Sequence, residues 1–338
     1  MSDFPWPQGR AFIVAEIGSN HNRSLGLAKE LIDAAAEAGA DAAKFQIYSA
    51  PTLYSAKDDE RLGYDGGNVS RLIESVATPR GWLPELSGYC ASKGILFFAA
   101  PFDLAAVDEL DAVSGLFKIA SFEIVDLPLI RHAASKGKPM IIATGLANMG
   151  EIEDAVTACR ERGNDSVALL QCASCYPAPA KIMNLRSMET MRRAFGVPVG
   201  LSDHTLGIHV STAAVAMGAS IIEKHFTMDR TMKGPDHSFA IEPRELAELV
   251  RQIREIESAL GNGMKSGPAQ EELVAYGYAR RSIHAAADIG KGTVITEDML
   301  MAKRPGHGIR PKYMQWVVGR RAALDIPGDS WITMEMLD

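Results

Sequence analysis

Short apolar runs of strand-forming residues alternate with segments of helical periodicity along the first part of the chain, and this alternation constrains the fold more than any other feature. Eight such runs are predicted to be strands: 12–16, 43–46, 96–100, 116–119, 140–143, 167–171, 197–201 and 220–224. Between them, segments such as 25–37, 152–162 and 210–217 repeat apolar residues at helical spacing. Glycines that follow helical segments, such as Gly39 and Gly94, support these boundaries because glycine ends helices at low cost.

Eight strands with alternating helices are typical of an α/β fold in which parallel strands close into a (β/α)8, or TIM, barrel. We predict this barrel for residues 1–260. A doubly wound open sheet is the alternative. That fold usually carries a glycine-rich fingerprint after its first strand, whereas this chain has EIGSNHN at residues 16–22. The barrel is therefore preferred.

The chain changes character after residue 260. Residues 261–279 begin with GNGMKSGPAQ, which lacks apolar periodicity and is interpreted as a linker. From residue 280, short strand-like pieces alternate with turns, which predicts a small second domain over 280–338 that is marginally stable alone. Within the barrel region, the polar segment 49–81 is either a loop that shapes the active site or a surface insertion.

Charge and composition argue against several classes of protein. The chain has 35 Lys and Arg against 42 Asp and Glu, whereas nucleic-acid-binding proteins usually have a basic excess. Its apolar runs are shorter than the roughly 20 residues that a membrane span needs, and its first residues lack the pattern of a secretory signal. Four cysteines are too few for a disulfide scaffold in 338 residues. We expect a cytoplasmic protein that binds neither nucleic acid nor membrane.

Polar side chains gather at the carboxyl ends of the predicted strands, where barrel enzymes carry their active sites. Lys44 and Gln46 share one face of the second strand, and Glu223 and His225 share one face of the eighth. Barrel interiors normally hold Val, Ile and Leu, so lysines and glutamates at inward positions indicate function. The set gathered at the strand ends is Glu16, Asn20, His21, Asn22, Lys44, Gln46, Lys118, Ser121, Glu123, Thr144, Ser174, Tyr176, Ser202, Asp203, His204, Thr205, Glu223 and His225.

Two histidines in this set, His204 and His225, end neighbouring strands and can converge on one ion, with Glu223 as an oxygen ligand. Two imidazoles with oxygen ligands and open positions suit Mn²⁺, Mg²⁺ or Co²⁺ acting as a Lewis acid better than a closed zinc site. The alternative is that both histidines are structural.

Two lysines from different strands, Lys44 and Lys118, form a candidate clamp for an anion. Hydroxyl groups of Ser121, Ser174 and Ser202 are available beside it as neutral donors. The alternative is that the lysine stems extend to the barrel rim and carry their charges into water.

Motifs of one enzyme family follow one another along the chain: EIGSNHN, AGADAAKFQIY, FKIASFEIVDLPLI, CYPAP, FGVPVGLSDHTLG, GASIIEKHFTMD, GPDHSFAIEP and KRPGHGI. Together they closely resemble the sialic acid synthase family, which makes N-acetylneuraminate and related nine-carbon sugars. The resemblance covers nearly the whole chain and includes a C-terminal part similar to the family's SAF domain, an antifreeze-like β-clip fold.

The resemblance implies condensation of phosphoenolpyruvate with an open-chain N-acyl hexosamine, either N-acetylmannosamine or a diacetamido relative, with release of phosphate. It implies that His204 and His225 hold a divalent metal that polarises the sugar aldehyde. It also implies a domain-swapped homodimer in which Arg304 reaches the N-acyl group from the partner subunit.

The resemblance assigns further roles residue by residue. Those implied to hold phosphoenolpyruvate are Lys44, Lys118, Ser121 and Ser202. Those implied to contact the sugar hydroxyls are Gln46, Tyr176 and Asp236, and Thr144 and Ser174 complete the candidate substrate-binding set. Glu16 and Glu123 are the carboxylates available for proton transfer and for positioning water.

Two motifs point to different sugars. Residues 120–123 (ASFE) resemble synthases of pseudaminic acid, which act on a diacetamido-trideoxy altrose, whereas 234–237 (GPDH) resemble the neuraminate and legionaminate branch. Two other classes of function are weighed: a metal-dependent pyruvate aldolase, and a sugar- or ice-binding module built on the SAF-like part. Simple binding would need no metal beside an anion clamp, so the synthase is preferred.

Overall fold

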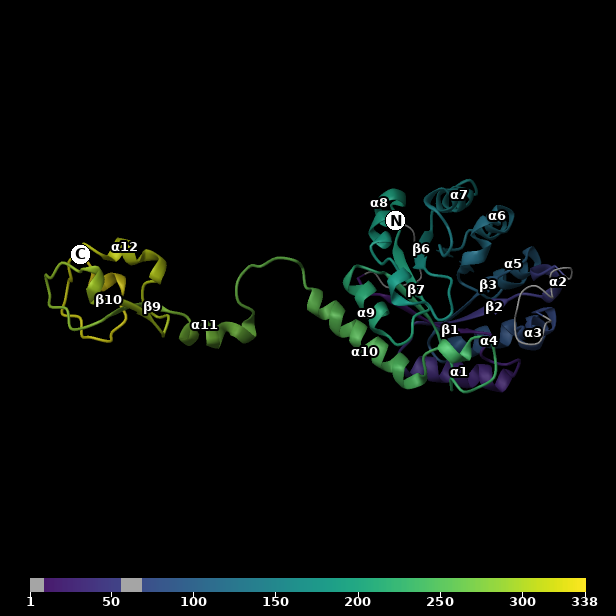
Figure 1. Cartoon of the computed structure of the whole chain (residues 1–338), viewed down its shortest axis with the longest axis horizontal. Helices are drawn as coiled ribbons and strands as arrows, with labels where there is room; N and C mark the ends of the chain where they lie inside the picture. Colours follow the sequence, from purple (N-terminus) through teal and green to yellow (C-terminus); the bar gives the residue numbers. More distant parts are fainter. Residues whose placement is uncertain (1–8, 56–68) are drawn as a thin grey trace. The chain divides into compact units, whose positions relative to one another are not determined.

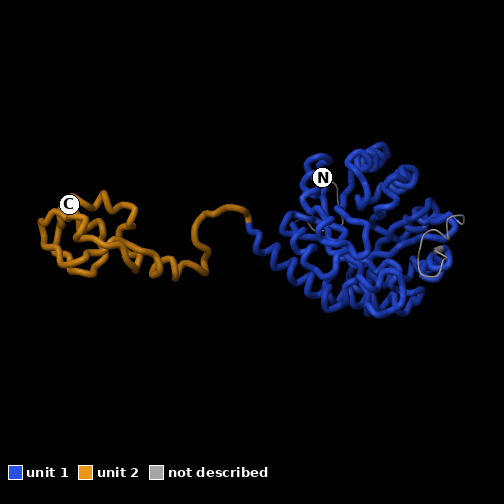
Figure 2. The backbone as a smooth tube through the Cα atoms, in the orientation of Figure 1, with its two compact units in different colours: residues 1–261 blue, residues 262–338 orange. Residues whose placement is uncertain are grey.

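The computed structural model describes residues 9–55 and 69–338, and the chain divides into two compact units, 1–261 and 262–338 (Figure 2). The first unit contains a closed barrel of parallel strands, and the second contains a two-stranded antiparallel sheet (Figure 1). Within the described ranges, the helices are too short or too polar to cross a membrane.

The barrel strands follow the order of the sequence. They are β1 (Phe12–Gly18), β2 (Ala42–Ile47), β3 (Leu96–Pro101), β4 (Phe117–Ile119), β5 (Met140–Ala143), β6 (Val167–Cys172), β7 (Val199–Asp203) and β8 (Ile221–His225). Strand β1 pairs in parallel with both β2 and β8, which closes the sheet on itself. The predicted barrel is therefore confirmed, and the doubly wound alternative is wrong.

Helices connect the strands and cover the outside of the barrel (Figure 1). They are α1 (Leu25–Glu37), α2 (Ala50–Leu53), α3 (Val69–Val76), α4 (Leu83–Ser92), α5 (Leu104–Asp111), α6 (Leu127–Ala134), α7 (Met149–Arg160), α8 (Ser187–Phe195), α9 (His209–Ala216) and α10 (Pro243–Leu260). Short 3₁₀ turns are η1 (Arg80–Trp82), η2 (Ser121–Val125), η3 (Ala180–Ile182) and η4 (His237–Phe239).

Local sequence signals explain where several helices begin. The Ser24 hydroxyl accepts a hydrogen bond from the Leu27 amide at the start of α1, and Asn148 forms a capping box with Glu151 at the start of α7. The predicted insertion 49–81 contains α2 and α3, and its residues 56–68 lie outside those described.

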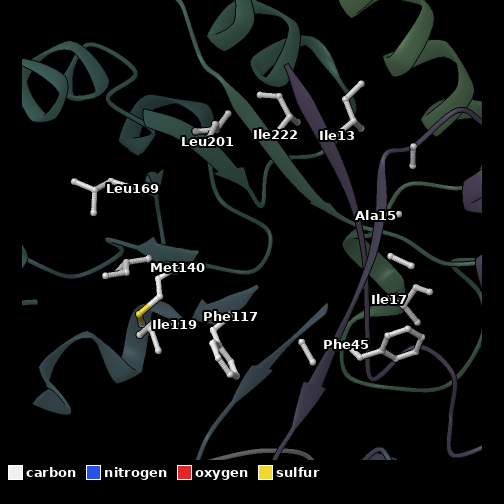
Figure 3. Packing of buried hydrophobic residues seen from close by; sticks show 14 of the residues in the cluster. Ile13, Ala15, Ile17, Phe45, Phe117, Ile119, Met140, Leu169, Leu201 and Ile222 are labelled. Carbon is white, nitrogen blue, oxygen red and sulfur yellow. The ribbon is translucent and has the colours of Figure 1, made fainter. Parts of the chain in front are cut away.

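Side chains alternate along each strand between two apolar layers. One layer lies between the strands and the helices and includes Ile13, Ala15 and Ile17 of β1, with equivalent residues of neighbouring strands (Figure 3). The other fills the barrel interior and includes Phe12 and Val14. This two-residue period places alternate positions of every strand inside the barrel.

The second unit has its own small core. It contains η5 (Gln270–Glu272), α11 (Leu273–Ala279), β9 (Ser282–Ala285), η6 (Glu297–Met299), β10 (Leu300–Lys303), η7 (Pro311–Tyr313), α12 (Met314–Val317) and η8 (Met334–Met336). Ile283, Ile295, Val317 and Ile332 are among its fully buried residues. The segment predicted as a linker, 261–279, contains η5 and α11.

Candidate functional site

The inward rows of the barrel change from apolar to polar toward the carboxyl ends of the strands. Along β1, Phe12 and Val14 are followed at the same face by Glu16. Lys44 lies beside Glu16 in the ladder between β1 and β2, and His225 lies beside Glu16 in the ladder between β1 and β8. The strand register therefore brings ionisable groups from distant parts of the sequence to one end of the barrel.

Two lysines and two carboxylates form a buried charge cluster at this end. Lys44 Nζ lies 2.8 Å from Glu16 Oε2 and 3.5 Å from Glu223 Oε1, and Lys118 Nζ lies 3.8 Å from Glu223 Oε1. These four residues are at most 5% exposed. Burial lowers the pKa of Lys118 and raises that of Glu16, although each faces opposite charge.

The two histidines lie close together, with ring centroids 5.4 Å apart. His204 Nδ1 lies 2.9 Å from the Ala173 carbonyl oxygen. Since a carbonyl only accepts hydrogen bonds, Nδ1 carries a proton, and Nε2 holds the lone pair when the ring is neutral. Burial by itself lowers the pKa of His204, but the hydrogen bond to Cys172 and its charge raise it overall. His225 Nδ1 is buried and finds no hydrogen-bond partner in the described part of the chain. Burial and the nearby His204 hold the pKa of His225 well below its usual value, so its ring is neutral.

A neutral imidazole nitrogen without a hydrogen-bond partner is the form that binds a divalent metal, so His225 Nδ1 fits a ligand role, and His204 fits it through Nε2 once that ring is deprotonated. Glu223, the third predicted ligand, directs Oε1 elsewhere: it accepts from Ser202 Oγ at 3.2 Å and faces the two lysines. Residues 9–55 and 69–338 contain no group of three or more His, Cys, Asp or Glu arranged to hold a metal. The other carboxylate oxygen of Glu223, Oε2, is buried with no hydrogen-bond partner among the described residues, so its role as a metal ligand stays a prediction.

A cavity of about 540 Å³ lies at the same end of the barrel and is lined by Gln46 and His225, among others. One side is polar and includes Gln46, Tyr176, His225 and Asp236. The Gln46 amide donates to Glu16 Oε1 at 2.6 Å, which ties the cavity wall to the charge cluster. The apolar lining residues include Leu53, Leu72, Ile73, Val76 and Phe102, of which Leu53, Ile73 and Phe102 pack in one cluster. The cavity therefore suits a small molecule with one polar and one apolar side.

Aromatic rings hold the histidines in place at the cavity floor. The Tyr176 ring lies 4.2 Å from the His204 ring, and Phe239 lies 5.0 Å from His225 and 5.3 Å from Tyr176, between centroids. Asp236 Oδ2 lies 3.7 Å from His225 Nδ1. Burial, followed by the charge of Glu16, raises the pKa of Asp236 to about 7.

The remaining predicted residues have different surroundings. Ser121 Oγ accepts from the Gly145 amide at 3.1 Å, and Ser174 Oγ is buried with no hydrogen-bond partner among the described residues. A Cβ at position 145 would collide with both serines, so glycine is needed there. The Thr144 hydroxyl donates to the Leu170 carbonyl at 2.9 Å. Arg304 is exposed and lies in the second unit, directly after β10.

Glu123 lies in η2 at the cavity edge. Its Oε2 is buried and without a hydrogen-bond partner among the described residues. Burial raises the pKa of Glu123 to about 7, although the charge of Lys118 opposes the shift. This carboxyl can therefore gain or lose a proton near neutral pH.

The raised pKa of Glu123 predicts a pH-dependent change in stability. The native state binds this proton more tightly than the unfolded chain does, so stability falls as pH rises from about 4.5 to about 7. Glu123→Gln mimics the protonated form and is expected to raise Tm by a few degrees at pH 8 and hardly at all at pH 4, since ~1 kcal/mol corresponds to ~2–4 °C. Thermal unfolding at both pH values measures this. Glu153→Gln, an exposed change on α7, is the control, and an equal shift at both pH values would contradict the prediction.

One buried pair was missed at the sequence level. Lys224 Nζ lies 2.9 Å from Asp203 Oδ2 and 2.7 Å from the Thr205 carbonyl oxygen. Asp203 also accepts from Ser211 Oγ of α9 at 2.6 Å. Asp203 and Lys224 lie directly opposite each other in the β7–β8 ladder and precede His204 and His225 in the sequence. A signal for this pair was present in the sequence. Lys224 occupies an outward position of β8, two residues after the apolar outward residue Ile222, so a buried lysine there needs an acidic partner.

Comparisons with known proteins match both parts of the chain. Residues 31–265 match the model of the NeuB family, and residues 280–338 match the SAF domain. The chain is 40% identical over 331 residues to N,N'-diacetyllegionaminic acid synthase of Campylobacter jejuni, covering 96% of this chain and 99% of that protein. It is 37% identical over 318 residues to pseudaminic acid synthase of Helicobacter pylori, covering 92% and 93%. The crystal structure of an N-acetylneuraminic acid synthetase from Leptospira borgpetersenii, in complex with citrate, superposes with a TM-score of 0.70 at 37% identity, covering 79% of this chain and 90% of that one.

Proposed function

Because the chain belongs to the NeuB family, we propose that it is a nonulosonic acid synthase working in the cytoplasm. Its reaction condenses phosphoenolpyruvate with an open-chain N-acyl hexosamine to a nine-carbon 2-keto acid and releases phosphate. The observation that carries the proposal is that the buried pair Lys44 and Lys118 and the adjoining rings of His204 and His225 lie at the same end of the barrel, where His225 and Gln46 line a cavity. This arrangement can hold an anion next to an activated carbonyl.

The lysines would hold the phosphate and carboxylate of phosphoenolpyruvate, with Ser121 and Ser202 as neutral donors. Ser174 supports the binding of phosphoenolpyruvate here. Its buried hydroxyl finds no partner in the described ranges, and an oxygen of the ligand would remove the cost of that unsatisfied group. Glu16 and Glu223 face the lysines, and their charges oppose the loss of the ammonium protons that burial favours.

His204 and His225 would hold the family's divalent metal, Mn²⁺, Mg²⁺ or Co²⁺, which as a Lewis acid polarises the sugar aldehyde when bound. The hydrogen bond from His204 Nδ1 to the Ala173 carbonyl leaves Nε2 free toward the ion. The Tyr176 ring packs against His204 and restricts its rotation.

The bond changes follow from the chemistry of phosphoenolpyruvate. Its C3 attacks the aldehyde carbon and forms the new C–C bond, which leaves positive charge at C2. Water adds at C2, and the resulting hemiketal phosphate breaks its C–O bond and releases phosphate. Lys44 and Lys118 would stabilise the charge on the departing phosphate. Glu123, with a pKa of about 7, could pass a proton to the aldehyde oxygen, and Glu16 would position the water.

We further propose that the sugar is a diacetamido-trideoxy hexose of the legionaminate type. Gln46, Tyr176 and Asp236 on the polar side of the cavity would contact hydroxyls. The apolar side, including Ile73 and Phe102, suits the methyl of a 6-deoxy sugar and of an additional acetamido group. N-acetylmannosamine would place hydroxyls against this wall, where they lose hydrogen bonds to water.

A phosphate-release assay tests the reaction and its sugar together. With phosphoenolpyruvate present, we expect kcat/KM for the diacetamido-trideoxy mannose to exceed that for N-acetylmannosamine at least about tenfold, as one or two apolar contacts allow. The diacetamido-trideoxy altrose tests the pseudaminate alternative. Ile73→Thr is expected to reduce the preference, while Leu104→Thr, an exposed change on α5, should leave it unchanged.

Two results would contradict the proposal. Phosphate release with none of the three sugars would rule out the synthase. Product formation from pyruvate in place of phosphoenolpyruvate would favour the aldolase.

We also propose a domain-swapped homodimer in which Arg304 completes the partner's site. Arg304 is exposed and forms no ion pair among the described residues, whereas its neighbour Lys303 pairs with Asp329. A guanidinium left free in this way is available to donate to an N-acyl oxygen.

Complementation between two inactive variants tests the swap. Arg304→Ala leaves the barrel intact, and His225→Ala leaves the second unit intact. A random mixture after subunit exchange contains about half heterodimers, each with one complete site, so about a quarter of wild-type activity is expected. A mixture that contains heterodimers but stays inactive would contradict the swapped arrangement.

A further inference from the structure

A second cavity, of about 480 Å³, lies within the second unit. It is bordered by α11, the turn after β10 and the start of η7. Its charged lining residues are Arg280, Arg281, Arg310 and Lys312, and no carboxylate of the described residues lines it. Its volume is within the range of small-molecule sites.

The four cations lack acidic partners. None of them forms an ion pair with another described residue. By contrast, Arg251 of α10 and Arg230, which precedes α10, each pair with glutamates. The second unit does contain acidic residues, since Lys303 pairs with Asp329 there. The cluster therefore concentrates positive charge at one place without a counter-charge, which is unfavourable until an anion binds.

Two of these guanidinium groups converge on one oxygen atom. Arg280 Nη1 lies 3.4 Å and Arg310 Nη2 lies 3.2 Å from the Tyr276 hydroxyl, and the Arg280 guanidinium packs over the Tyr276 ring at 4.3 Å. Each guanidinium has five N–H donors, so most of them remain available. The Tyr276 hydroxyl thus holds the guanidinium groups of Arg280 and Arg310 near each other.

Backbone packing forms the opposite wall of this cavity. The Gly306 amide donates to the Gly277 carbonyl at 3.2 Å, which joins the turn after β10 to α11. A Cβ at position 306 would lie 2.8 Å from Arg280 Cβ. Only glycine lets the turn approach Arg280 so closely, and this approach shapes the cavity.

We propose that this cavity binds the phosphate group of a small anion. Arginine forks match the oxygens of phosphate in pairs, and a tetrahedral dianion can accept from several donors at once. Inorganic phosphate and phosphoenolpyruvate share this group. The site differs from the lysine pair of the barrel, and it does not depend on the reaction proposed above.

Calorimetric titration of the intact protein at fixed ionic strength tests the site. Inorganic phosphate and phosphoenolpyruvate are titrated separately into the wild type, into Arg280→Gln/Arg310→Gln, and into Arg321→Gln. Arg321 is the matched control because its guanidinium donates to the Gly292 carbonyl and does not line the cavity. Both cavity arginines are exposed, and circular dichroism checks that the variants stay folded.

We expect the double variant to lose one binding event, or to bind at least tenfold more weakly, while the control matches the wild type. The anion whose binding changes identifies the source of the phosphate group. Equal binding of both anions by the wild type and the double variant would overturn the proposal. An equal loss of anion binding in Arg321→Gln would also overturn the proposal, because the loss would then follow from the lower net charge of the protein and not from the cavity.

Discussion

His225→Ala is expected to lower kcat at least about a hundredfold while the barrel stays folded, since loss of a group that stabilises charge in the transition state costs ~2.7 kcal/mol or more. The Nδ1 atom of His225 makes no hydrogen bond to the described residues, so the substitution removes ring packing against His204 and Phe239 but no hydrogen bond at this atom. Phosphate release at saturating substrates measures kcat, and circular dichroism measures folding.

Direct metal titration separates a ligand role from a structural one. We expect His204→Ala and His225→Ala to bind Mn²⁺ more weakly than the wild type, and chelation of the wild type to stop turnover until Mn²⁺, Mg²⁺ or Co²⁺ is added. His132→Ala is the control, because His132 pairs with Asp108 on the outer helices. Activity of His225→Ala within a few-fold of wild type, or full activity after chelation, would contradict the proposed role.

Lys224→Met is expected to destabilise the protein by about 3–5 kcal/mol, because it leaves the Asp203 carboxylate buried without its counter-charge. Asp203 is 1% and Lys224 2% exposed, so water cannot replace the lost partner. Urea unfolding of the barrel measures the change. Lys181→Met, at an exposed position of η3, should change stability by less than about 0.5 kcal/mol.

The same variant tests what the pair does for the site. Asp203 and Lys224 precede His204 and His225 and join β7 to β8. If the pair orients the histidines, Lys224→Met should also bind Mn²⁺ more weakly at temperatures where it is folded. Unfolding within 1 kcal/mol of wild type would show that the ion pair contributes little.

The barrel could be predicted because strand and helix periodicities alternate without interruption through most of the first unit. Strand ends were harder to predict. Strand β7 was expected to end at residue 201, but its ladder continues through Ser202 and Asp203. Polar residues usually mark loops, whereas here they are buried because the strand end carries the candidate site. Where polar site residues occupy the end of a strand, the strand boundary therefore cannot be predicted from residue polarity.

The candidate site residues could be found from their shared strand faces, as with Lys44 and Gln46, or Glu223 and His225. Their partners could not be found in this way. From its strand position alone, Glu223 can face either the lysines or the histidines. Only the side-chain geometry shows that its Oε1 atom faces Lys44 and Lys118. The segment 49–81 appeared polar overall, yet Leu72, Ile73 and Val76 share one face of α3 and form the apolar cavity wall.

The apolar floor beneath the charge cluster has a consequence for salt. Phe12, Val14, Phe98 and Leu170 fill the barrel interior below Lys44 and exclude water and counter-ions from that side. Dissolved ions screen exposed charges within about 10 Å at 0.1 M but screen buried charges much less. Binding of an anion by Lys44 and Lys118 should therefore respond weakly to ionic strength, whereas binding by the exposed Arg280 and Arg310 should weaken steeply. Salt concentration alone can thus tell the two anion sites of this chain apart.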